Sequence, residues 1–524
     1  MKRTPVIHPF LFACYAVLGV YSTNMIQIPV QWVARPLIVL LIFIAGVYFI
    51  LRRITKDGQY AGLVTTLALF WLFFGHIQRA LFEISPFWNT TSGILIAFIA
   101  WTVPLVFLGS QWAWKRITNR TFVTSMLNFT SCFAILFPAY STGSSLIQTT
   151  EQIEMYENRS SSNLPLVLSV PTLAPDIYLI ILDAYGRQDF LKDVYGYDNS
   201  DFINDLKNRG FYVADESAAN YPQTLLSLSS LLNMQYLDGL TEGLERVSSR
   251  GPIVHLFQQN RVRRSLYDAG YAFVALPSAT LSTQVRDADL YVQMTWGDIN
   301  EFEGLLLSST VANLAIEAWE LNIPVPSYEL HRRYILFSLD NLETISRVGG
   351  PKFVFSHIMA PHPPFVLDRF GEEIQPSRPF NTGDASGFMG THEEYTAAYI
   401  DEVRYLNQRL IKAIDSILAT SARPPIIIIQ GDHGPGNYFN LVAPENSCLK
   451  ERYSILNAYY FPDKNYEALY PTITPVNSFR VVLNQYFGTG LDVLDDRSYY
   501  AAWLTPYLYS DVSDEIRTCE IPAK

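Results

Sequence analysis

Apolar residues are concentrated before about residue 147, where five long stretches follow one another. They run near Pro9–Pro29, Pro36–Leu51, Tyr60–Phe82, Ser92–Trp114 and Phe122–Thr142. A helix needs about 20 such residues to cross a bilayer core of roughly 30 Å. The second stretch is short, and polar residues at Ser22, Thr23 and Asn24 interrupt the first. The pattern predicts a transmembrane domain of about five helices over residues 1–147, and buried helices of a soluble domain are the alternative.

The basic residues of this region lie mainly in alternate loops. They precede the first stretch, separate the second from the third, and separate the fourth from the fifth: Lys2, Arg3, Arg52, Arg53, Lys56, Lys115, Arg116 and Arg120. The other two loops carry only Arg35 and Arg79. Because basic loops stay in the cytoplasm, an odd number of spans places everything after about residue 147 outside it. Residues 148–175 are polar and rich in Ser and Pro, which predicts a juxtamembrane linker.

From Pro175 onward, the patterns of strands and amphipathic helices alternate. Strands are expected at Asp176–Leu182, Tyr271–Leu276, Lys352–Ile358, Ile426–Gln430 and Asn457–Phe461. The clearest helix runs from about Glu393 to Leu418, with apolar positions three and four residues apart, and Thr391 with Glu394 offers a capping box. This alternation predicts a doubly wound, mainly parallel sheet sandwiched by helices, an α/β domain over residues 176–524.

Acidic residues follow two of the predicted strands. Four consecutive isoleucines suit a strand buried on both faces, and Gly431, Asp432 and His433 come directly after it. The first predicted strand ends in the same way, at Asp183. Ligands of open α/β sheets bind at these carboxyl ends, so the two acids and His433 are candidate metal ligands. The alternative role of each acid is to cap a turn or a helix.

A helical pattern begins at Thr224, after Pro222. A hydroxyl at a helix amino terminus lies beside free N–H groups and the positive end of the helix dipole, which favour a bound phosphate or sulfate. Such a hydroxyl can attack the anion if a metal lowers its pKa. An ordinary helix cap is the alternative, and Ser227 and Ser229 are further hydroxyls of the same pattern.

Three histidines lie in or near the ends of predicted elements. His362 follows the strand Lys352–Ile358 in a proline-rich loop, whose fixed backbone makes it the best candidate of the three. His392 starts the long helix. His357 lies inside the strand and is expected to be a core residue with a satisfied ring.

Charge and cysteine content narrow the class of protein. The net charge of -11 argues against nucleic acid as a partner. Cys14 and Cys132 fall in the apolar region, whereas Cys448 and Cys519 lie in the polar remainder. The latter two can form one disulfide in an oxidising compartment or stay free.

The order of these motifs resembles the alkaline phosphatase superfamily. The likeness rests on the strand ending in Asp183, the helix beginning at Thr224, the His362 loop and the strand ending in Gly431-Asp432-His433-Gly434. It is nearest to the sulfatase-like branch, which contains the lipoteichoic acid synthases and the lipid A phosphoethanolamine transferases. The resemblance implies one divalent metal ion, Mn, Mg or Zn, bound by Asp183, Thr224, Asp432 and His433. It also implies that Thr224 is the nucleophile and that His362 binds the substrate phosphate or assists the leaving group.

The same resemblance implies a function and a location. Arg187, His362 and His392 become the candidate substrate-binding residues. The expected activity is a membrane-anchored phosphotransferase that takes a phospho-alcohol group from a membrane lipid to an envelope glycan, polymer or lipid. The expected location is a bacterial-type plasma membrane, with the catalytic domain outside the cytoplasm. A hydrolase of phosphate or sulfate esters and a catalytically silent envelope binding protein are the alternatives.

The sequence departs from these branches in three ways. The C/S-x-P-x-R motif that matures to formylglycine in true sulfatases is absent, which disfavours sulfate esters as substrates. Asp183 stands where the two named branches usually have Glu. Four cysteines are too few for the disulfide-rich phosphoethanolamine branch.

Overall fold

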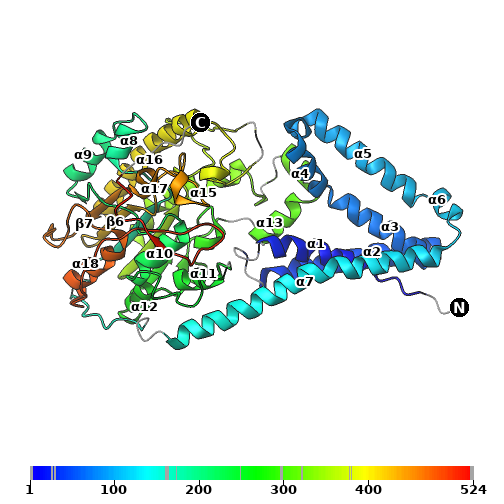
Figure 1. Ribbon diagram of the computed structural model, residues 1–524, viewed down its shortest axis with the longest axis horizontal. Helices are drawn as coiled ribbons and strands as arrows, with labels where there is room; N and C mark the ends of the chain where they lie inside the picture. The colour runs from blue at the N-terminus through cyan, green and yellow to red at the C-terminus, as the bar shows by residue number, and fades with distance from the viewer. Residues whose placement is uncertain are drawn as a thin grey trace. The chain divides into compact units, whose positions relative to one another are not determined.

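The computed structural model divides the chain into two compact units (Figure 1). The helical unit comprises Met1–Gln148, Thr295–Ser327 and Ser377–Pro379, and the α/β unit comprises Thr149–Met294, Tyr328–Pro376 and Phe380–Lys524. Within them the structure describes residues 4–24, 28, 31–159, 164–172, 174–247, 249–294, 299–319, 321, 323–376, 378, 380–517 and 519.

Each of the five apolar stretches forms helix. The helices are α1 (His8–Asn24), α2 (Gln31–Thr55), α3 (Gly58–Leu72), α4 (Phe74–Ile84), α5 (Thr91–Gly109), α6 (Gln111–Arg116) and α7 (Arg120–Arg159). Because α7 runs on to Arg159, the first part of the predicted linker over 148–175 is helical. Two short helices from later in the chain, α13 (Glu301–Ser308) and α14 (Ala312–Ala318), complete the helical unit.

The prediction of about five membrane spans is confirmed only in part. Among the described residues, three helical segments are long and apolar enough to cross a membrane: Trp32–Thr55, Thr91–Gly109 and Arg120–Ser144. The α3–α4 pair, bent by 44° at its break, becomes a fourth if it counts as one span. α1 has 17 residues, about 26 Å of helix, and falls short of the roughly 30 Å hydrocarbon core. Three or four apolar helices, rather than five, therefore suggest membrane anchoring.

A segment from the middle of the sequence packs within the helical unit. Phe302 of α13 is fully buried, and its ring lies 6.2 Å from that of Tyr21 in α1. The next residue, Glu303, pairs with Arg35 of α2 through two hydrogen bonds of 2.6 and 2.5 Å. The domain predicted from the sequence over residues 176–524 included this segment, whereas the structure assigns it to the helical unit.

The same segment closes the break between α3 and α4. A helix end leaves backbone N–H and C=O groups without intrahelical partners. Here the Val311 N–H donates to Leu72 O at 2.6 Å, and the Gly75 N–H donates to Ser309 O at 3.0 Å. The inserted segment therefore satisfies the polar backbone groups that the break exposes.

A seven-stranded, mainly parallel sheet forms the centre of the α/β unit. Its spatial order is β2 (Tyr212–Val213), β7 (Asn457–Tyr460), β6 (Ile426–Gly431), β1 (Ile177–Leu182), β5 (Lys352–Ile358), β3 (Ala272–Ala275) and β4 (Leu290–Tyr291). β1 pairs in parallel with β5 and β6, and β3 with β5 and β4, whereas β7 is antiparallel to β6 and β2. The predicted mainly parallel sheet is confirmed, and each predicted strand is present.

Helices cover both faces of this sheet. Ile177, Leu179 and Ile181 of β1 pack in one core with residues of α10 (Thr224–Asn233), α11 (Gly251–Gln258), α12 (Arg261–Asp268) and α18 (Pro475–Phe487). Tyr178, Ile180 and Leu182 pack in a second core with α8 (Gln188–Asp193), α9 (Ser200–Asn208), α15 (Tyr328–Leu342) and α16 (His392–Thr420). Burial on both faces explains why the central strands are continuously apolar.

The start of α16 and the cysteines of the α/β unit were also considered in the sequence analysis. α16 begins with the capping box of Thr391 and Glu394, as the sequence predicted. Cys448 and Cys519 form a disulfide, which fixes the amino end of α17 (Leu449–Tyr453) because Cys448 is its N-cap residue.

Candidate metal centre

Asp183 and Asp432 lie close together because their strands are neighbours. The register of β1 and β6 pairs the residues directly before the two acids. On the other side of β1, Ile181 is paired with His357 of β5. Side chains alternate along a strand, so Asp183 points to the same side as Ile181 and His357. Three polar side chains therefore meet near the carboxyl ends of three parallel strands.

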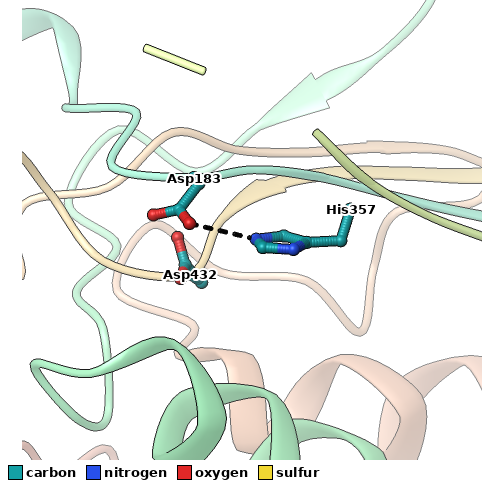
Figure 2. A group of neighbouring side chains, drawn as sticks. All are labelled: Asp183, His357 and Asp432. Carbon is teal, nitrogen blue, oxygen red and sulfur yellow. Dashed lines mark ion pairs between the residues drawn. The ribbon is translucent and has the colours of Figure 1, made fainter. Parts of the chain in front are cut away.

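The imidazole of His357 points at the two carboxylates (Figure 2). Ligand atoms of Asp183, His357 and Asp432 all lie within 4.8 Å of one another, and each side chain is at most 2% exposed. Asp183 Oδ1, His357 Nε2 and Asp432 Oδ2 are buried without a hydrogen-bond partner. Two buried carboxylates are costly without a positive charge between them. Carboxylate oxygens and an imidazole nitrogen are the donors of divalent metal sites, so these residues fit a metal ion.

The backbone after β1 orients one of these carboxylates. Ala184 adopts a left-handed conformation, with φ of 65°, and its N–H donates to Asp432 Oδ1 at 3.1 Å. The other oxygen, Oδ2, is thereby left to the cluster. A left-handed non-glycine residue is strained, and such strain is typical of functional sites.

His357 is the residue that sequence reasoning placed wrongly. Its Nδ1 lies 3.0 Å from the Ser278 hydroxyl and 2.8 Å from the Thr283 hydroxyl, which fix the ring. Its Nε2 lies 3.2 Å from Asp183 Oδ2. The ring is buried as expected, but its Nε2 makes no hydrogen bond and faces the two acids. Only the pairing of β1 with β5 reveals this, and a strand histidine carries no such signal in the sequence.

His433 adds a second imidazole. Its Nδ1 donates to Gly434 O at 3.0 Å, so Nε2 carries the lone pair. This Nε2 lies 3.5 Å from Asp183 Oδ1 and 3.3 Å from Asp432 Oδ2. Burial lowers the pKa of His433, and the guanidinium of Arg452 lowers it further. The ring therefore stays neutral and able to bind a metal.

Thr224 is the first residue of α10, as the sequence predicted. The residue before it, Gln223, is the N-cap and makes no side-chain capping hydrogen bond. The Thr224 hydroxyl oxygen lies 3.2 Å from His433 Nε2. The structure thus brings together all four predicted ligands, and it adds His357 to them.

The other hydroxyls of α10 are used in the fold. Ser227 donates to the backbone carbonyl of Asp432 at 2.6 Å. Ser229 donates to Ile253 O at 3.2 Å. Each bond joins α10 to a neighbouring element, which favours structural roles for these two serines.

Arg452 and Asp384 form a buried ion pair beside His433. Arg452 Nη1 lies 2.5 Å from Asp384 Oδ2, and Nη2 lies 3.3 Å from His433 Nε2. Its Nε donates to Pro222 O at 2.8 Å, two residues before Thr224. Burial alone would raise the pKa of Asp384, but Arg452 outweighs it and holds that pKa below its usual range. Sequence reasoning missed both residues, because no motif marks the loop that contains Asp384.

His362 approaches from the loop after β5. Its Nδ1 donates to Pro363 O at 2.6 Å, and its Nε2 lies 3.9 Å from Asp384 Oδ2. The ring centre is 6.4 Å from that of His433. Burial would raise the pKa of Asp183, but the imidazoles around it, His362 first among them, outweigh burial and hold that pKa well below its usual range. Asp183 is therefore ionised and ready for a cation.

The two remaining candidates for substrate binding have other partners. Arg187 binds both carboxylate oxygens of Asp189, at 2.6 and 3.0 Å, and donates to a backbone carbonyl at 2.6 Å. His392 is exposed, and its Nδ1 lies 2.8 Å from Asn437 Oδ1. Neither makes a hydrogen bond to a described residue of the metal cluster.

Two glycines allow the loop after β6 to pass against other backbone. A Cβ at Gly434 would lie 2.0 Å from Glu451 O, and one at Gly431 would lie 2.5 Å from Tyr185 O. No side chain fits there. The glycines around Asp432 and His433 are thus required by packing.

Sequence comparison assigns the family. A sequence profile described as Sulfatase matches residues 175–479, more than half of the 524 residues. The chain belongs to the sulfatase family. This confirms the resemblance to the alkaline phosphatase superfamily that the strand-end motifs indicated. Among curated proteins, none matches this chain.

Several solved structures are similar to this chain. The C-terminal periplasmic domain of EcEptC from Escherichia coli is 11% identical, with a TM-score of 0.44, over 66% of this chain and 96% of that one. Lipooligosaccharide phosphoethanolamine transferase A (EptA) from Neisseria meningitidis is 12% identical, with a TM-score of 0.40, over 91% and 95%. A putative sulfatase from Bacteroides thetaiotaomicron is 12% identical, with a TM-score of 0.39, over 64% and 74%.

Proposed function

We propose that this sulfatase-family protein is a membrane-anchored, metal-dependent phosphotransferase. It would move a phospho-alcohol group, of the phosphoglycerol or phosphoethanolamine type, from a lipid to an envelope glycan, polymer or lipid. The proposal rests on the position of Thr224, which is the first residue of α10. Its hydroxyl lies 3.2 Å from His433 Nε2, beside two buried carboxylates. A nucleophile, a helix end suited to anions and a metal-binding cluster meet there.

Asp183, Thr224, Asp432 and His433 would hold one divalent ion, and His357 Nε2 is placed to join them. When bound, that ion would supply the positive charge that lowers the pKa of the Thr224 hydroxyl and neutralises a phosphate. The oxygen ligands suit Mn²⁺ or Mg²⁺, and two imidazoles suit Zn²⁺.

The Thr224 oxygen would attack the phosphorus atom of the donor lipid. A bond forms between this oxygen and phosphorus, and the bond from phosphorus to the lipid alcohol oxygen breaks. Thr224 loses its proton and the departing lipid alcohol gains one. The acceptor hydroxyl then attacks the same phosphorus, gives up its proton and releases Thr224, which is protonated again. The N–H groups at the start of α10 would hold the phosphoryl oxygens in both steps.

His362 would carry the proton to the leaving group. Its Nδ1–H is held by Pro363 O, so a second proton would sit on Nε2. That atom lies 3.9 Å from Asp384 Oδ2, and the centre of its ring lies 6.4 Å from that of His433. In the second step the same nitrogen would take the proton of the acceptor hydroxyl.

The residue at the nucleophile position supports phosphate esters as substrates. Threonine is not a precursor of formylglycine, and the formylglycine motif is absent from the sequence. A threonine hydroxyl needs only activation to attack phosphorus.

The helical unit supports a lipid substrate, because apolar helices would hold the site near the membrane. We extend the proposal to five spans, counting α1 and the α3–α4 pair, with the amino terminus in the cytoplasm of a bacterial-type cell. Residues 176–524, without the 295–327 segment, would then be the extracytoplasmic catalytic domain. The disulfide between Cys448 and Cys519 supports an oxidising compartment.

Trapping the covalent intermediate tests this function. Full-length protein in lipid nanodiscs would be incubated with phosphatidylglycerol or phosphatidylethanolamine labelled in the head-group alcohol. We expect label on the peptide that contains Thr224 and release of diacylglycerol, and neither with Thr224→Ala. Failure to cleave both lipids would contradict the proposal. Label that passes to water rather than to added envelope glycan or lipid would identify the hydrolase alternative.

A further inference from the structure

Arg250 is a buried cation without an acidic partner among the residues that the structure describes. Its side chain contacts an amide and a carbonyl but no described carboxylate, although the residue is only 6% exposed. Burial lowers the pKa of its guanidinium to about 10, which leaves it charged at neutral pH. A buried charge is costly without a counter-ion, so this position calls for an anion.

Part of the guanidinium is available to a ligand. Nη2 donates to Gln223 Oε1 at 2.5 Å and to Trp503 O at 3.0 Å. In the described part of the chain, Nε and Nη1 donate to no group, and neither is sealed from solvent. These N–H groups are suited to a charge-assisted hydrogen bond with a carboxylate or phosphate.

Trp503 provides an exposed aromatic face beside this charge. The guanidinium carbon of Arg250 lies 4.0 Å from the centre of the indole ring. The residue is nevertheless 48% exposed, and its backbone N–H is fixed to Leu441 O at 2.8 Å. An exposed tryptophan held next to an arginine is typical of a recognition surface, where both residue types are enriched.

Both residues are tied to the start of α10. Gln223, which accepts the Arg250 hydrogen bond, is the N-cap residue and directly precedes Thr224. The same Gln223 side chain donates to Ala501 O at 2.8 Å, which holds the segment that contains Trp503. A ligand on Arg250 would therefore lie next to the group carried by Thr224.

The geometry points to a second substrate subsite, in which Arg250 and Trp503 bind an anionic sugar of the acceptor. This inference rests on the proposed transfer to an envelope acceptor. The anionic group of the sugar binds the remaining N–H groups of Arg250, and a face of the sugar ring packs on the exposed indole. The acceptor hydroxyl is thereby brought to the phosphoryl group on Thr224.

Two small sugars that differ in one charge test the subsite. Methyl β-glucuronide carries a carboxylate where methyl β-glucoside carries a hydroxymethyl group. Their binding to the full-length protein in detergent is measured by saturation-transfer NMR. We expect the glucuronide to bind at least about tenfold more tightly, which corresponds to one charge-assisted hydrogen bond.

Variants then locate the binding. Arg250→Gln should bring the two affinities within about twofold of each other, and Trp503→Ala should weaken both sugars. Arg209→Gln is the matched control, because this arginine pairs with Asp415 at 2.6 and 2.9 Å away from the site, and it should keep the preference. If Arg250→Gln does not fold, Arg250→Lys, which keeps a charge but loses the fork of donors, should reduce the preference.

Two results would overturn the subsite. One is equal binding of both sugars by the parent protein. The other is unchanged binding of both sugars by Trp503→Ala, whose side chain is 48% exposed. The measurement needs no turnover. A protein that prefers the glucuronide through Arg250 but transfers nothing from a lipid would therefore refute the proposed function and leave the subsite standing. A protein that forms the Thr224 intermediate but binds both sugars equally would refute the subsite and leave the proposed function standing.

Discussion

His357 Nε2 and Asp183 Oδ2 lie 3.2 Å apart, across the pairing of β5 with β1. Hydroxyls hold the other ring nitrogen, so the ring can turn only Nε2 to the acid. The contact joins the third strand of the site to the two that carry the acids. His357 is therefore a candidate metal ligand and not only a core residue.

Replacing His357 with Gln should lower the affinity for the divalent ion at least about tenfold, because the imidazole donor is lost while most of its volume remains. Isothermal titration of the metal-depleted protein with Mn²⁺ or Zn²⁺ would measure this. His392→Ala, an exposed histidine, should bind metal like the parent. Unchanged affinity in His357→Gln would show that the ring is only structural.

Thr224→Ala should lose turnover of the lipid donor by roughly 10³-fold or more, because the attacking oxygen is removed. Thr224→Ser keeps the hydroxyl and should retain measurable activity. Ser229→Ala is the control on the same helix; it loses the hydrogen bond from its hydroxyl to Ile253 O and about 1 kcal/mol of stability but should keep turnover. Near-parent rates from Thr224→Ala would refute the nucleophile assignment.

The stability of the α/β unit should fall as pH rises from about 5 to 8. Glu402 is fully buried and accepts the Val366 N–H at 3.1 Å, and burial raises its pKa to about 8. In the unfolded chain its pKa is near the ordinary 4.5. A raised pKa means that the folded state holds the proton, so the stabilisation is complete below pH 4.5 and is lost as pH passes 8.

Glu402→Gln should therefore flatten the pH dependence of the free energy of unfolding of the full chain between pH 5.5 and 8.5, by on the order of a few kcal/mol. Glu343→Gln is the matched control. Burial would raise the pKa of Glu343, but Lys412 and Arg409 outweigh it and lower that pKa, so its titration lies below this range. An unchanged slope in Glu402→Gln would contradict the prediction.

Arg452→Leu should destabilise the α/β unit by about 3–5 kcal/mol, because Asp384 would be left as an unpaired buried charge. Adding Asp384→Leu should recover part of this loss, since the unpaired charge is removed. Thermal unfolding of the single and double variants measures both effects. Lys192→Ala, which breaks an exposed ion pair with Asp198, should change little. Equal stabilities of Arg452→Leu and the parent would show that the pair is not needed.

Topology has a direct test. A reporter that is active only outside the cytoplasm, fused after Lys524, should be active, because the basic loops of the helical unit favour a cytoplasmic amino terminus. A cytoplasmic reporter at the same place should be silent. The opposite pattern would refute the extracytoplasmic location of the α/β unit.

The strand-end acids and the helix start at Thr224 were predictable because their signals are local. Uninterrupted isoleucines before Gly431 mark a strand, and the acid after it must lie at the carboxyl edge of a parallel sheet. Pro222 and the apolar period after it mark the helix. Such patterns need no knowledge of which strands are neighbours.

His357, Asp384 and Arg452 were not predictable in the same way. The role of His357 depends on the register of β5 against β1, and that of Arg452 depends on a loop contact with Asp384. Hydropathy also does not locate helix ends, and in the structure α1 ends after 17 residues and α3 bends into α4. Long-range pairing and helix ends are decided by packing.

The placement of α13 has a practical consequence for anyone who divides this chain. An α/β fragment cut out after α7 would take residues 299–319 with it, yet the partners of Phe302 and Glu303 would remain behind in the discarded helices. Such a fragment would expose an apolar surface and a broken set of backbone hydrogen bonds, and it should aggregate without detergent. Soluble preparations should instead omit residues 295–327, which belong to the helical unit, and join the flanking ends through a polar linker.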